Sequence, residues 1–125
     1  MKKTVHFLKA LGQHNRLRLV KALLGGEYCV CELTDALELS QSNLSRHLSL
    51  LDRAGLLVAH KKATWAYYSI LPESASKLRN LLGLLGDPDS PRAQADAERL
   101  HKRVAMRHNG ECCISDRQLP KSGVR

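Results

Sequence analysis

The fold of this chain is decided by the stretch LSQSNLSRHLSLLDRAG, which occupies residues 39–55. Ser40 is a strong helix N-cap, and Ala54-Gly55 closes the stretch with a typical helix stop. Between these ends, apolar residues recur on one helical face at Leu44, Leu48 and Leu51. We therefore predict an amphipathic helix over 41–54 with a polar outer face.

A shorter helix is expected just before this one. Within GEYCVCELTDALELS, residues 26–40, a short apolar stripe is formed by Val30, Leu33 and Leu37. With Cys29 at the N-cap, Glu32 becomes the third helical residue, which is a usual place for an acid. The short link between the two helices is typical of a helix-turn-helix, whose second helix enters the major groove of DNA.

The apolar pattern changes after Gly55. The segments LLVAH (56–60) and TWAYYSI (64–70) are rich in β-branched and aromatic residues, which favours strands. They flank the basic link Lys61-Lys62-Ala63. The expected fold is therefore mainly α, a winged helix-turn-helix with a two-stranded β wing and a basic turn.

Three other leucine-rich helices are expected outside this motif. The first ends at Gly12 and carries one stripe of Val5, Leu8 and Leu11. The second is capped by Asn15 and faces inward with Leu17, Val20, Leu23 and Leu24. The third is opened by Pro72 and carries Leu78, Leu81, Leu82 and Leu85. The first and third have larger apolar faces than one small domain needs, so we expect a homodimer through these terminal helices.

The chain divides into three parts at a linker rich in proline and aspartate. Residues 1–86 form the expected DNA-binding and dimerisation domain, and residues 87–91 form the linker. Residues 92–125 form an extension, in which a polar helix runs from about Arg92 to His108. A flexible tail that carries Cys112-Cys113 follows that helix.

Composition narrows the classes of function. The 125 residues carry a formal net charge of +8, which favours a polyanionic partner such as nucleic acid. No apolar run approaches the ~20 residues that span a bilayer, so we expect a cytoplasmic protein without a membrane partner. In that compartment the four cysteines are expected to be thiols rather than structural disulfides. No nucleophile–base arrangement or phosphate-binding glycine loop is visible, so we expect neither an enzyme nor an organic cofactor.

The outer face of the helix at 41–54 supplies the candidate contacts to double-stranded DNA. Amide side chains pair well with adenine, an arginine reaches guanine or phosphate, and serines let the backbone approach. The candidate residues are Gln41, Ser42, Asn43, Ser45 and Arg46, with Lys61 and Lys62 of the wing on phosphate or the minor groove. We interpret His47, at the edge of this face, as a packed or phosphate-facing residue rather than a metal ligand.

The stretch from about Leu11 to Ile70 resembles the ArsR/SmtB family of winged-helix metalloregulators. The resemblance is carried by RLRLVKALLGGEYCVCEL (16–33), LSQSNLSRHLSLLDRAGLL (39–57) and TWAYYSI (64–70), which together span about half of the chain. CVCEL looks like the thiol site of the arsenic-responsive branch, in which a third cysteine usually stands where this chain has Thr34. The segment RHNGECC, residues 107–113, resembles a C-terminal thiol pair of some arsenic-responsive members. The resemblance implies a homodimeric repressor that leaves its operator when a metalloid binds.

The thiols Cys29, Cys31, Cys112 and Cys113 are the candidate ligands of As(III) or Sb(III), which are soft, three-coordinate centres. Side chains two residues apart in mid-helix diverge by about 200°. At a helix start, however, the N-cap has non-helical dihedral angles, so Cys29 and Cys31 can converge. We expect the helix N-terminus to lower the pKa of these thiols. The third ligand then comes from Cys112 or Cys113, or the late pair forms its own site.

Other functions remain open on the sequence alone. A repressor of the same fold that responds to zinc, cadmium, mercury or thiol oxidation uses the same residues. A basic nucleic-acid-binding module that senses nothing is the alternative from another class. For the repressor, a dimer places two recognition helices about one DNA turn apart, so the operator is expected to be an imperfect inverted repeat.

Overall fold

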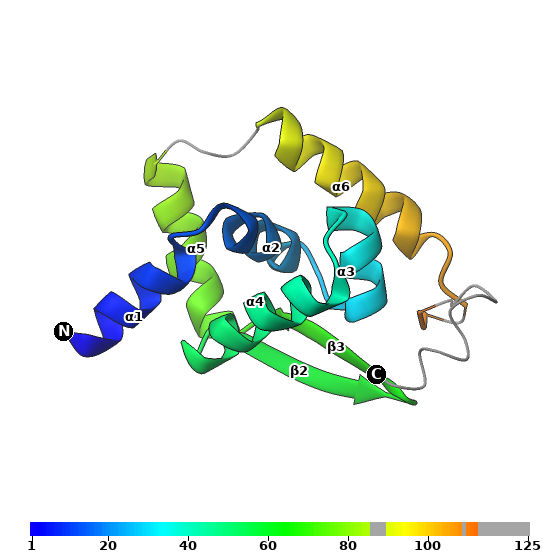
Figure 1. Ribbon diagram of the computed structural model, residues 1–125, viewed down its shortest axis with the longest axis horizontal. Helices are drawn as coiled ribbons and strands as arrows, with labels where there is room; N and C mark the ends of the chain where they lie inside the picture. Colours follow the sequence, from blue (N-terminus) through cyan, green and yellow to red (C-terminus); the bar gives the residue numbers. More distant parts are fainter. Residues whose placement is uncertain (86–89, 109, 113–125) are drawn as a thin grey trace.

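The computed structural model describes residues 1–85, 90–108 and 110–112, and its architecture is mainly helical. Within these residues, the helices are α1 (Lys2–Leu11), α2 (His14–Leu24), α3 (Val30–Leu37), α4 (Gln41–Arg53), α5 (Pro72–Leu85) and α6 (Pro91–Val104). The strands are β1 (Tyr28–Cys29), β2 (Leu57–Lys62) and β3 (Trp65–Ile70). Figure 1 shows α2, α3 and α4 at the centre, the β2–β3 hairpin below them and α6 across the top.

The helix-turn-helix is formed by α3 and α4, as expected. The chain leaves α3 through Glu38, which adopts the left-handed conformation with φ 58° and so turns the backbone toward α4. Ser40 caps α4, and its hydroxyl accepts a hydrogen bond of 3.2 Å from the backbone N–H of Asn43. The predicted inner face of α4 is confirmed, since all three of its leucines are buried, namely Leu44, Leu48 and Leu51.

The wing contains one strand more than the sequence indicated. The sheet is antiparallel in the order β1–β3–β2, because Cys29 of β1 pairs with Tyr67 of β3. The β2–β3 hairpin turns through Ala63 and Thr64, since Lys62 pairs with Trp65. The expected basic turn is therefore corrected, because Lys61 and Lys62 end strand β2 instead of forming the turn.

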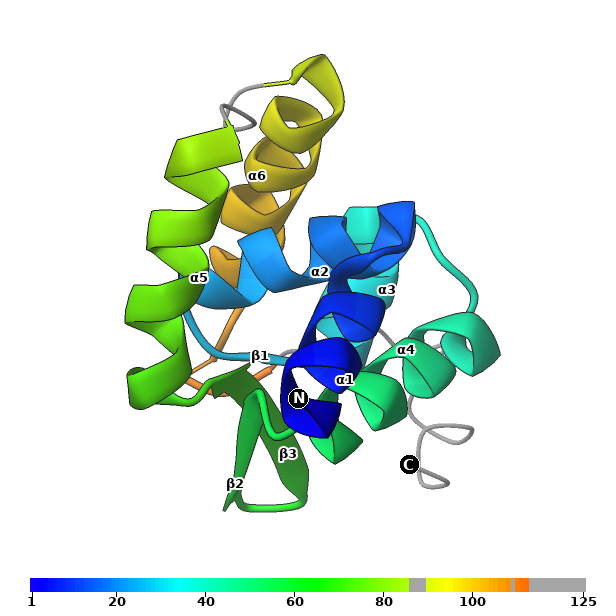
Figure 2. The same cartoon turned by 90° about the vertical axis from the view of Figure 1, so that its left-hand side faces the viewer.

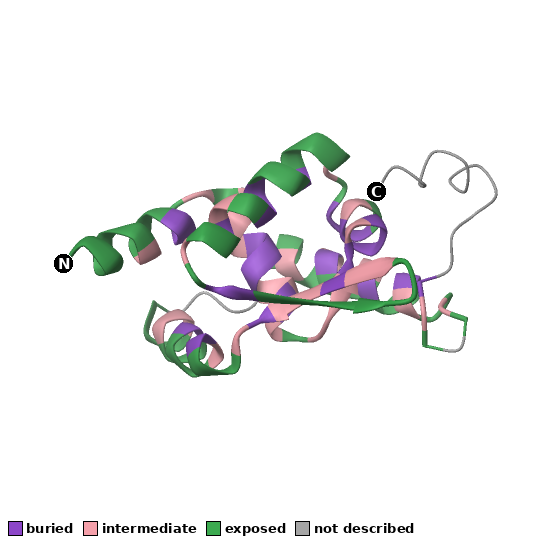
Figure 3. Cartoon of the chain, turned by 90° about the horizontal axis from the view of Figure 1, so that it is seen from below, coloured by how far each residue is buried: buried purple, intermediate pink, exposed green. Residues whose placement is uncertain are grey.

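The core is aliphatic and is shared by the helices and the base of the wing. Figure 3 shows the buried positions gathered where the helices meet the sheet, while most of α1 is exposed. Fully buried leucines come from four helices and from the start of the wing, and they include Leu19, Leu33, Leu44, Leu56 and Leu78. Burying one such side chain stabilises the fold by roughly 1.5–3 kcal/mol. Because α3 and α4 both contribute side chains to this core, the core fixes the orientation of one helix relative to the other.

The start of α2 differs from the expectation. The N-cap is Gln13, whose side-chain oxygen accepts a 2.9 Å hydrogen bond from the backbone N–H of Arg16. Asn15 lies inside the helix, where its side chain accepts a 2.9 Å hydrogen bond from Arg18. The predicted cap at Asn15 is therefore wrong. The side chain of Asn15 accepts from the buried guanidinium of Arg18 instead of from the helix backbone.

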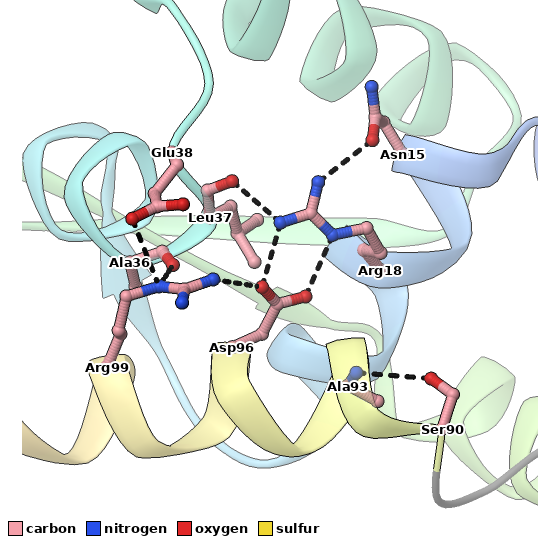
Figure 4. Close-up of polar contacts among 9 residues, drawn as sticks. All are labelled: Asn15, Arg18, Ala36, Leu37, Glu38, Ser90, Ala93, Asp96 and Arg99. Carbon is pink, nitrogen blue, oxygen red and sulfur yellow. Dashed lines mark hydrogen bonds and ion pairs between the residues drawn. The ribbon is translucent and has the colours of Figure 1, made fainter.

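Helix α6 packs along α3 and α2, as both views of the fold show (Figures 1 and 2). Asp96 of α6 is buried and accepts two 2.8 Å hydrogen bonds from Arg18 of α2, as Figure 4 shows. The helix begins at Pro91 after the cap Ser90 and ends at Val104, so it starts earlier and ends sooner than expected. Of the predicted linker at 87–91, residues 87–89 lie outside the described residues, as does the tail beyond Cys112, whereas Ser90 and Pro91 are the cap and first residue of α6. The proposed division near residue 86 stays a prediction.

Apolar residues of α1 and α5 remain exposed in the monomer. The expected stripe of α1 buries only its last residue, Leu11, whereas Val5 and Leu8 are exposed. On α5, Leu78 is buried, but Leu84 and Leu85 are 85 % and 68 % exposed. None of the described helices is long and apolar enough to cross a membrane.

Candidate thiol site and nucleic-acid interface

The outer face of α4 is presented to solvent as a continuous polar surface. Each of its predicted DNA-contacting residues is exposed, namely Gln41, Ser42, Asn43, Ser45 and Arg46. A guanidinium nitrogen of Arg46 donates a 3.2 Å hydrogen bond to the Asn43 side chain, which orients both groups on the same face. The structure therefore leaves this surface available for the edges of bases, and contact with DNA stays a prediction for each residue.

The two wing lysines lie at the far end of β2. Lys61 and Lys62 are both exposed, and the Lys62 ammonium lies 5.5 Å from the centre of the Tyr67 ring. An ammonium at this distance over an aromatic face is held by a cation–π attraction. The lysines thus remain accessible to a phosphate backbone, while one of them also touches a side chain of the thiol region.

His47 is buried behind the recognition surface, as expected for a packed residue. Its ring nitrogen Nδ1 lies 3.4 Å from a guanidinium nitrogen of Arg16 on α2. Burial lowers the pKa of His47, and the positive charges of Arg16 and Arg46 lower it further. The ring therefore links α2 to α4, and both effects favour its neutral form.

Three cysteines that lie far apart in the sequence meet in one buried cluster. The sulfur atoms of Cys29, Cys31 and Cys112 all lie within 4.8 Å of one another. Each residue is buried, and all three are present as thiols. They pack against the buried ring of Tyr67 and the partly buried Trp65 of β3. The cluster thus joins the start of α3, the wing and the segment after α6; Cys113 lies outside the described residues.

The start of α3 explains how two cysteines in a C-x-C sequence converge. Cys29 is the N-cap, with extended dihedral angles, and Cys31 lies in the first turn of the helix. The buried carboxylate of Glu32 accepts a 3.1 Å hydrogen bond from the backbone N–H of Cys29. This reciprocal cap fixes the dihedral angles of Cys29 and so directs its sulfur toward that of Cys31.

Cys112 contacts Tyr67 and Arg103 as well as the other two thiols. Its backbone N–H donates a 2.7 Å hydrogen bond to the hydroxyl of Tyr67, and a guanidinium nitrogen of Arg103 lies 3.7 Å from its sulfur. The turn before it is closed by backbone hydrogen bonds of 2.9 Å between His108 and Glu111. Thr34, at the position where the family resemblance implied a third cysteine, donates to the backbone carbonyl of Cys31 at 3.0 Å.

Three arginines fasten the C-terminal segment to α3, and we call Arg99, Arg103 and Arg107 the arginine ladder. They are spaced four residues apart: Arg99 and Arg103 share one face of α6, and Arg107 follows three residues after the helix ends at Val104. Arg99 donates to the backbone carbonyl of Ala36 at 2.6 Å, and Arg103 donates to Asp35 at 2.8 Å. Arg107 makes two 2.7 Å hydrogen bonds to Glu32. The ladder fixes the register of α6 on α3 and thereby delivers Cys112 to the other two thiols.

The electrostatics of the cluster favour protonated thiols. The pKa of Cys29 is strongly raised by hydrogen bonding with the Cys112 and Cys31 thiols and by burial, although the Glu32 backbone N–H lowers it. For Cys112, the Cys29 thiol lowers the pKa, whereas the Cys31 thiol and burial raise it to about 11. The expectation that the helix N-terminus would lower the pKa of Cys29 is therefore wrong, because thiol–thiol hydrogen bonds and desolvation outweigh the cap.

Four residues of this region were not identified from the sequence. Glu32 and Arg107 form an ion pair next to the thiols, while Tyr67 and Arg103 contact Cys112 directly. The spacing of the arginines was a partial signal, since Arg99 and Arg103, four residues apart, share a face of α6. By contrast, His101 and His108 share no helical face, because α6 ends at Val104.

A helix-turn-helix with an exposed polar second helix, followed by a hairpin with basic residues, defines a winged helix-turn-helix DNA-binding protein. Residues 13–58 match the family model described as "Bacterial regulatory protein, arsR family". The arsenic resistance transcriptional regulator ArsR1 of Pseudomonas putida is 41 % identical over 93 residues, which cover 74 % of this chain and 73 % of that relative. The chain therefore belongs to the ArsR family and is a DNA-binding transcriptional repressor.

Solved structures agree with this assignment. The reduced form of HlyU from Vibrio cholerae is 38 % identical with a TM-score of 0.62, over 70 % of this chain and 92 % of that chain. The homodimeric winged helix-turn-helix domain of Mb0332 from Mycobacterium bovis, a possible ArsR-family regulator, is 28 % identical with a TM-score of 0.63. That match covers 69 % of this chain and 80 % of the neighbour. The family and fold are those of DNA-binding regulators rather than enzymes.

Proposed function

We propose that this protein is a cytoplasmic, homodimeric repressor that binds operator DNA without ligand and leaves it when As(III) or Sb(III) binds cysteine sulfur. The observation that carries the proposal is the cluster of three buried thiols, Cys29, Cys31 and Cys112, with all sulfurs within 4.8 Å of one another. The likeness to an arsenic resistance regulator supports the choice of inducer.

The thiol cluster fits a trivalent metalloid in number and in size. Three sulfur ligands complete the pyramidal coordination of As(III) or Sb(III), which are soft centres. With sulfur–metal bonds of about 2.3 Å and the angles of about 95° of a pyramid, two sulfurs on one ion lie about 3.4 Å apart. The three sulfurs already lie within 4.8 Å of one another, so binding draws them closer together, and no carboxylate or imidazole joins the cluster among the described residues.

The protonated state of the thiols suits arsenite, which is neutral arsenous acid at pH 7. Three As–O bonds break and three As–S bonds form, and each hydroxide leaves with one thiol proton as water. The raised pKa of Cys29 and of Cys112 therefore does not oppose binding, because no net proton is released. A dication would instead have to expel these protons.

The cluster can influence DNA binding because it contacts both the helix-turn-helix and the wing. Cys29 caps α3, the first helix of the helix-turn-helix, and pairs with Tyr67 in strand β3 of the wing. Drawing the three sulfurs together around one atom pulls on both elements at once. Metalloid binding then stabilises an arrangement of α3, α4 and the wing that holds DNA weakly. By linkage, operator DNA weakens metalloid binding by the same factor.

Dimerisation follows from the exposed leucines of the terminal helices. Leu8 on α1 and Leu84 and Leu85 on α5 are exposed in the monomer. A two-fold interface with a second copy of the chain would remove these apolar side chains from water, which is favourable. The homodimeric neighbour from Mycobacterium bovis supports this arrangement. Two copies of α4 about one DNA turn apart would match an imperfect inverted repeat in the operator.

A gel-shift titration on the DNA upstream of the gene tests the proposal. Arsenite should release the wild-type protein, while Cys29→Ser, Cys31→Ser and Cys112→Ser should bind DNA normally but need more than about a hundredfold more arsenite. Even loss of an outer-shell partner of a metal ligand costs roughly 10–100-fold, so losing a ligand should cost at least as much.

Cys113→Ser is the matched control, since it removes a neighbouring thiol and leaves three ligands. It should be released as readily as the wild type. Undiminished release of Cys112→Ser would refute the three-thiol site, whereas release by zinc or by peroxide but not arsenite would assign a different signal. Equal affinity for a random duplex would instead indicate a module that senses nothing.

A further inference from the structure

Arg103 lies beside the thiol cluster with hydrogen-bonding capacity left over. Its side chain is 7 % exposed, and one guanidinium nitrogen, Nη2, lies 3.7 Å from the Cys112 sulfur. Its Nε donates to Asp35, whose own side chain is 43 % exposed. The third nitrogen, Nη1, is buried and finds no hydrogen-bond partner among the residues that the structure describes. Buried donors of this kind are uncommon and call for a functional explanation.

The charge of the occupied thiol cluster depends on the ion. Three thiolates around As(III) form a neutral complex. Three thiolates around a divalent cation keep one net negative charge, and a buried charge is unfavourable unless a partner compensates it. An adjacent guanidinium supplies that compensation, because charge-assisted hydrogen bonds to anionic sulfur strengthen when the acceptor gains charge.

We propose that Arg103 is the residue that lets this site accept a soft divalent cation such as Cd²⁺ in addition to As(III). Its positive charge neutralises the anionic trithiolate complex, and its Nη2 donates to the Cys112 sulfur. This inference rests on the proposed three-thiol site and adds a second class of ligand to it. On Cd²⁺ binding, three Cd–S bonds form while each thiol releases its proton to solvent.

The other members of the arginine ladder are less suited to this role. Arg107 lies near the Tyr67 ring, at 5.4 Å from its centre, but uses Nε and Nη2 on the two oxygens of buried Glu32. Arg99 is directed to Asp96 and to the carbonyl of Ala36, as Figure 4 shows. Arg103 is the member with a contact to a thiol sulfur, and the carboxylate that opposes its charge is partly solvated.

The experiment measures ion binding by the DNA-free, full-length protein. Cadmium chloride is titrated and followed by the ultraviolet absorption of cadmium–thiolate bonds, and arsenite binding is measured by elemental analysis after desalting. Arg103→Met should weaken Cd²⁺ binding by roughly ten- to a hundredfold, the scale of a hydrogen bond to a charged group. Arsenite affinity should change by less than about threefold, because its complex is neutral.

Three further variants separate charge from structure. Arg103→Lys keeps the positive charge and should retain most of the Cd²⁺ affinity. Arg92→Met removes one exposed positive charge at the start of α6 and should behave as the wild type. Arg99→Met loosens α6 without touching a thiol and should change both affinities by the same factor.

The proposal is overturned if Arg103→Met weakens both ions equally, if it leaves Cd²⁺ binding unchanged, or if Arg103→Lys loses Cd²⁺ as fully as Arg103→Met. A wild-type protein that binds arsenite through the three thiols but does not bind Cd²⁺ also overturns it and leaves the proposed function standing. A wild type that binds neither ion contradicts both proposals.

Discussion

The recognition surface on α4 and the thiol cluster are built in opposite ways. The candidate DNA contacts come from one exposed helix and one strand end, so each lies where local sequence puts it. The thiols come from the start of α3 and from the segment after α6, and they are buried. A surface that meets a large polyanion needs exposure and charge, whereas a site for a single soft atom needs convergence and exclusion of water. The proposed metalloid binding and DNA binding should therefore depend on different forces and respond differently to perturbation.

The largest expected difference between the two sites is in the salt dependence of their affinities. Raising the salt concentration from about 50 to 200 mM should lower operator affinity by about a thousandfold if the dimer neutralises roughly six phosphates. Arsenite binding to the DNA-free protein should change by less than about twofold, because the thiols are buried and the complex carries no charge. Fluorescence anisotropy with labelled operator and arsenite titration at each salt concentration measure both quantities. A flat salt response of the operator complex would contradict DNA binding through the basic face.

Glu32→Ala should lower the free energy of unfolding more than the substitution of an exposed residue on α4 does. The change leaves Arg107 without its carboxylate and the Cys29 N–H without its acceptor. Breaking a buried ion pair by removing one partner costs about 3–5 kcal/mol of the free energy of unfolding. Urea unfolding measures this cost. Asp52→Ala, an exposed acid on α4, is the control and should change that free energy by about 0.5 kcal/mol or less. Equal unfolding midpoints for the two variants would show that the Glu32 pair does not hold the site.

Arg46→Ala should have the smallest effect of the three and act on DNA alone. Loss of one contact to a base or phosphate should weaken operator binding by roughly ten- to a hundredfold. The free energy of unfolding and the arsenite affinity of the DNA-free protein should be unchanged, because Arg46 is exposed and its hydrogen bond goes to Asn43 on the surface of α4. Arg92→Ala on α6, tested by the same anisotropy titration, controls for the loss of one charge. A matching loss in both variants would assign the effect to net charge rather than to the recognition helix.

The contrast between a surface built from one local segment and a cluster built from distant segments explains which features the sequence predicted well. Caps and apolar stripes are local, so Ser40 and Cys29 were identified as N-caps and the inner leucines of α4 were confirmed. The winged helix-turn-helix followed from the same local patterns, and the family followed from the resemblance of residues 11–70; both are confirmed. The meeting of Cys29 and Cys31 at a helix start was also predictable, since it depends only on the position of the cap.

The features that were missed depend on contacts between distant segments. Strand β1 has two residues and exists because Cys29 pairs with Tyr67, a partner that no local pattern indicates. The sequence indicated only a polar helix at α6, yet Arg103 of this helix is buried and donates to Asp35 of α3. The pKa of Cys29 rises because two other thiols and the core surround it, which cannot be inferred from the helix start alone.

The four-residue spacing of the arginine ladder has a consequence for how such proteins diversify. Inserting or deleting one residue in α6 turns all following side chains by about 100° and would carry Cys112 out of the cluster. The segment that matches the family model, residues 13–58, contains α4 and would keep its sequence. The third thiol of the proposed site and the recognition helix are thus encoded in separate stretches of the chain, so a one-residue change in α6 can remove Cys112 from the cluster while α4 and the pair Cys29 and Cys31 keep their sequence.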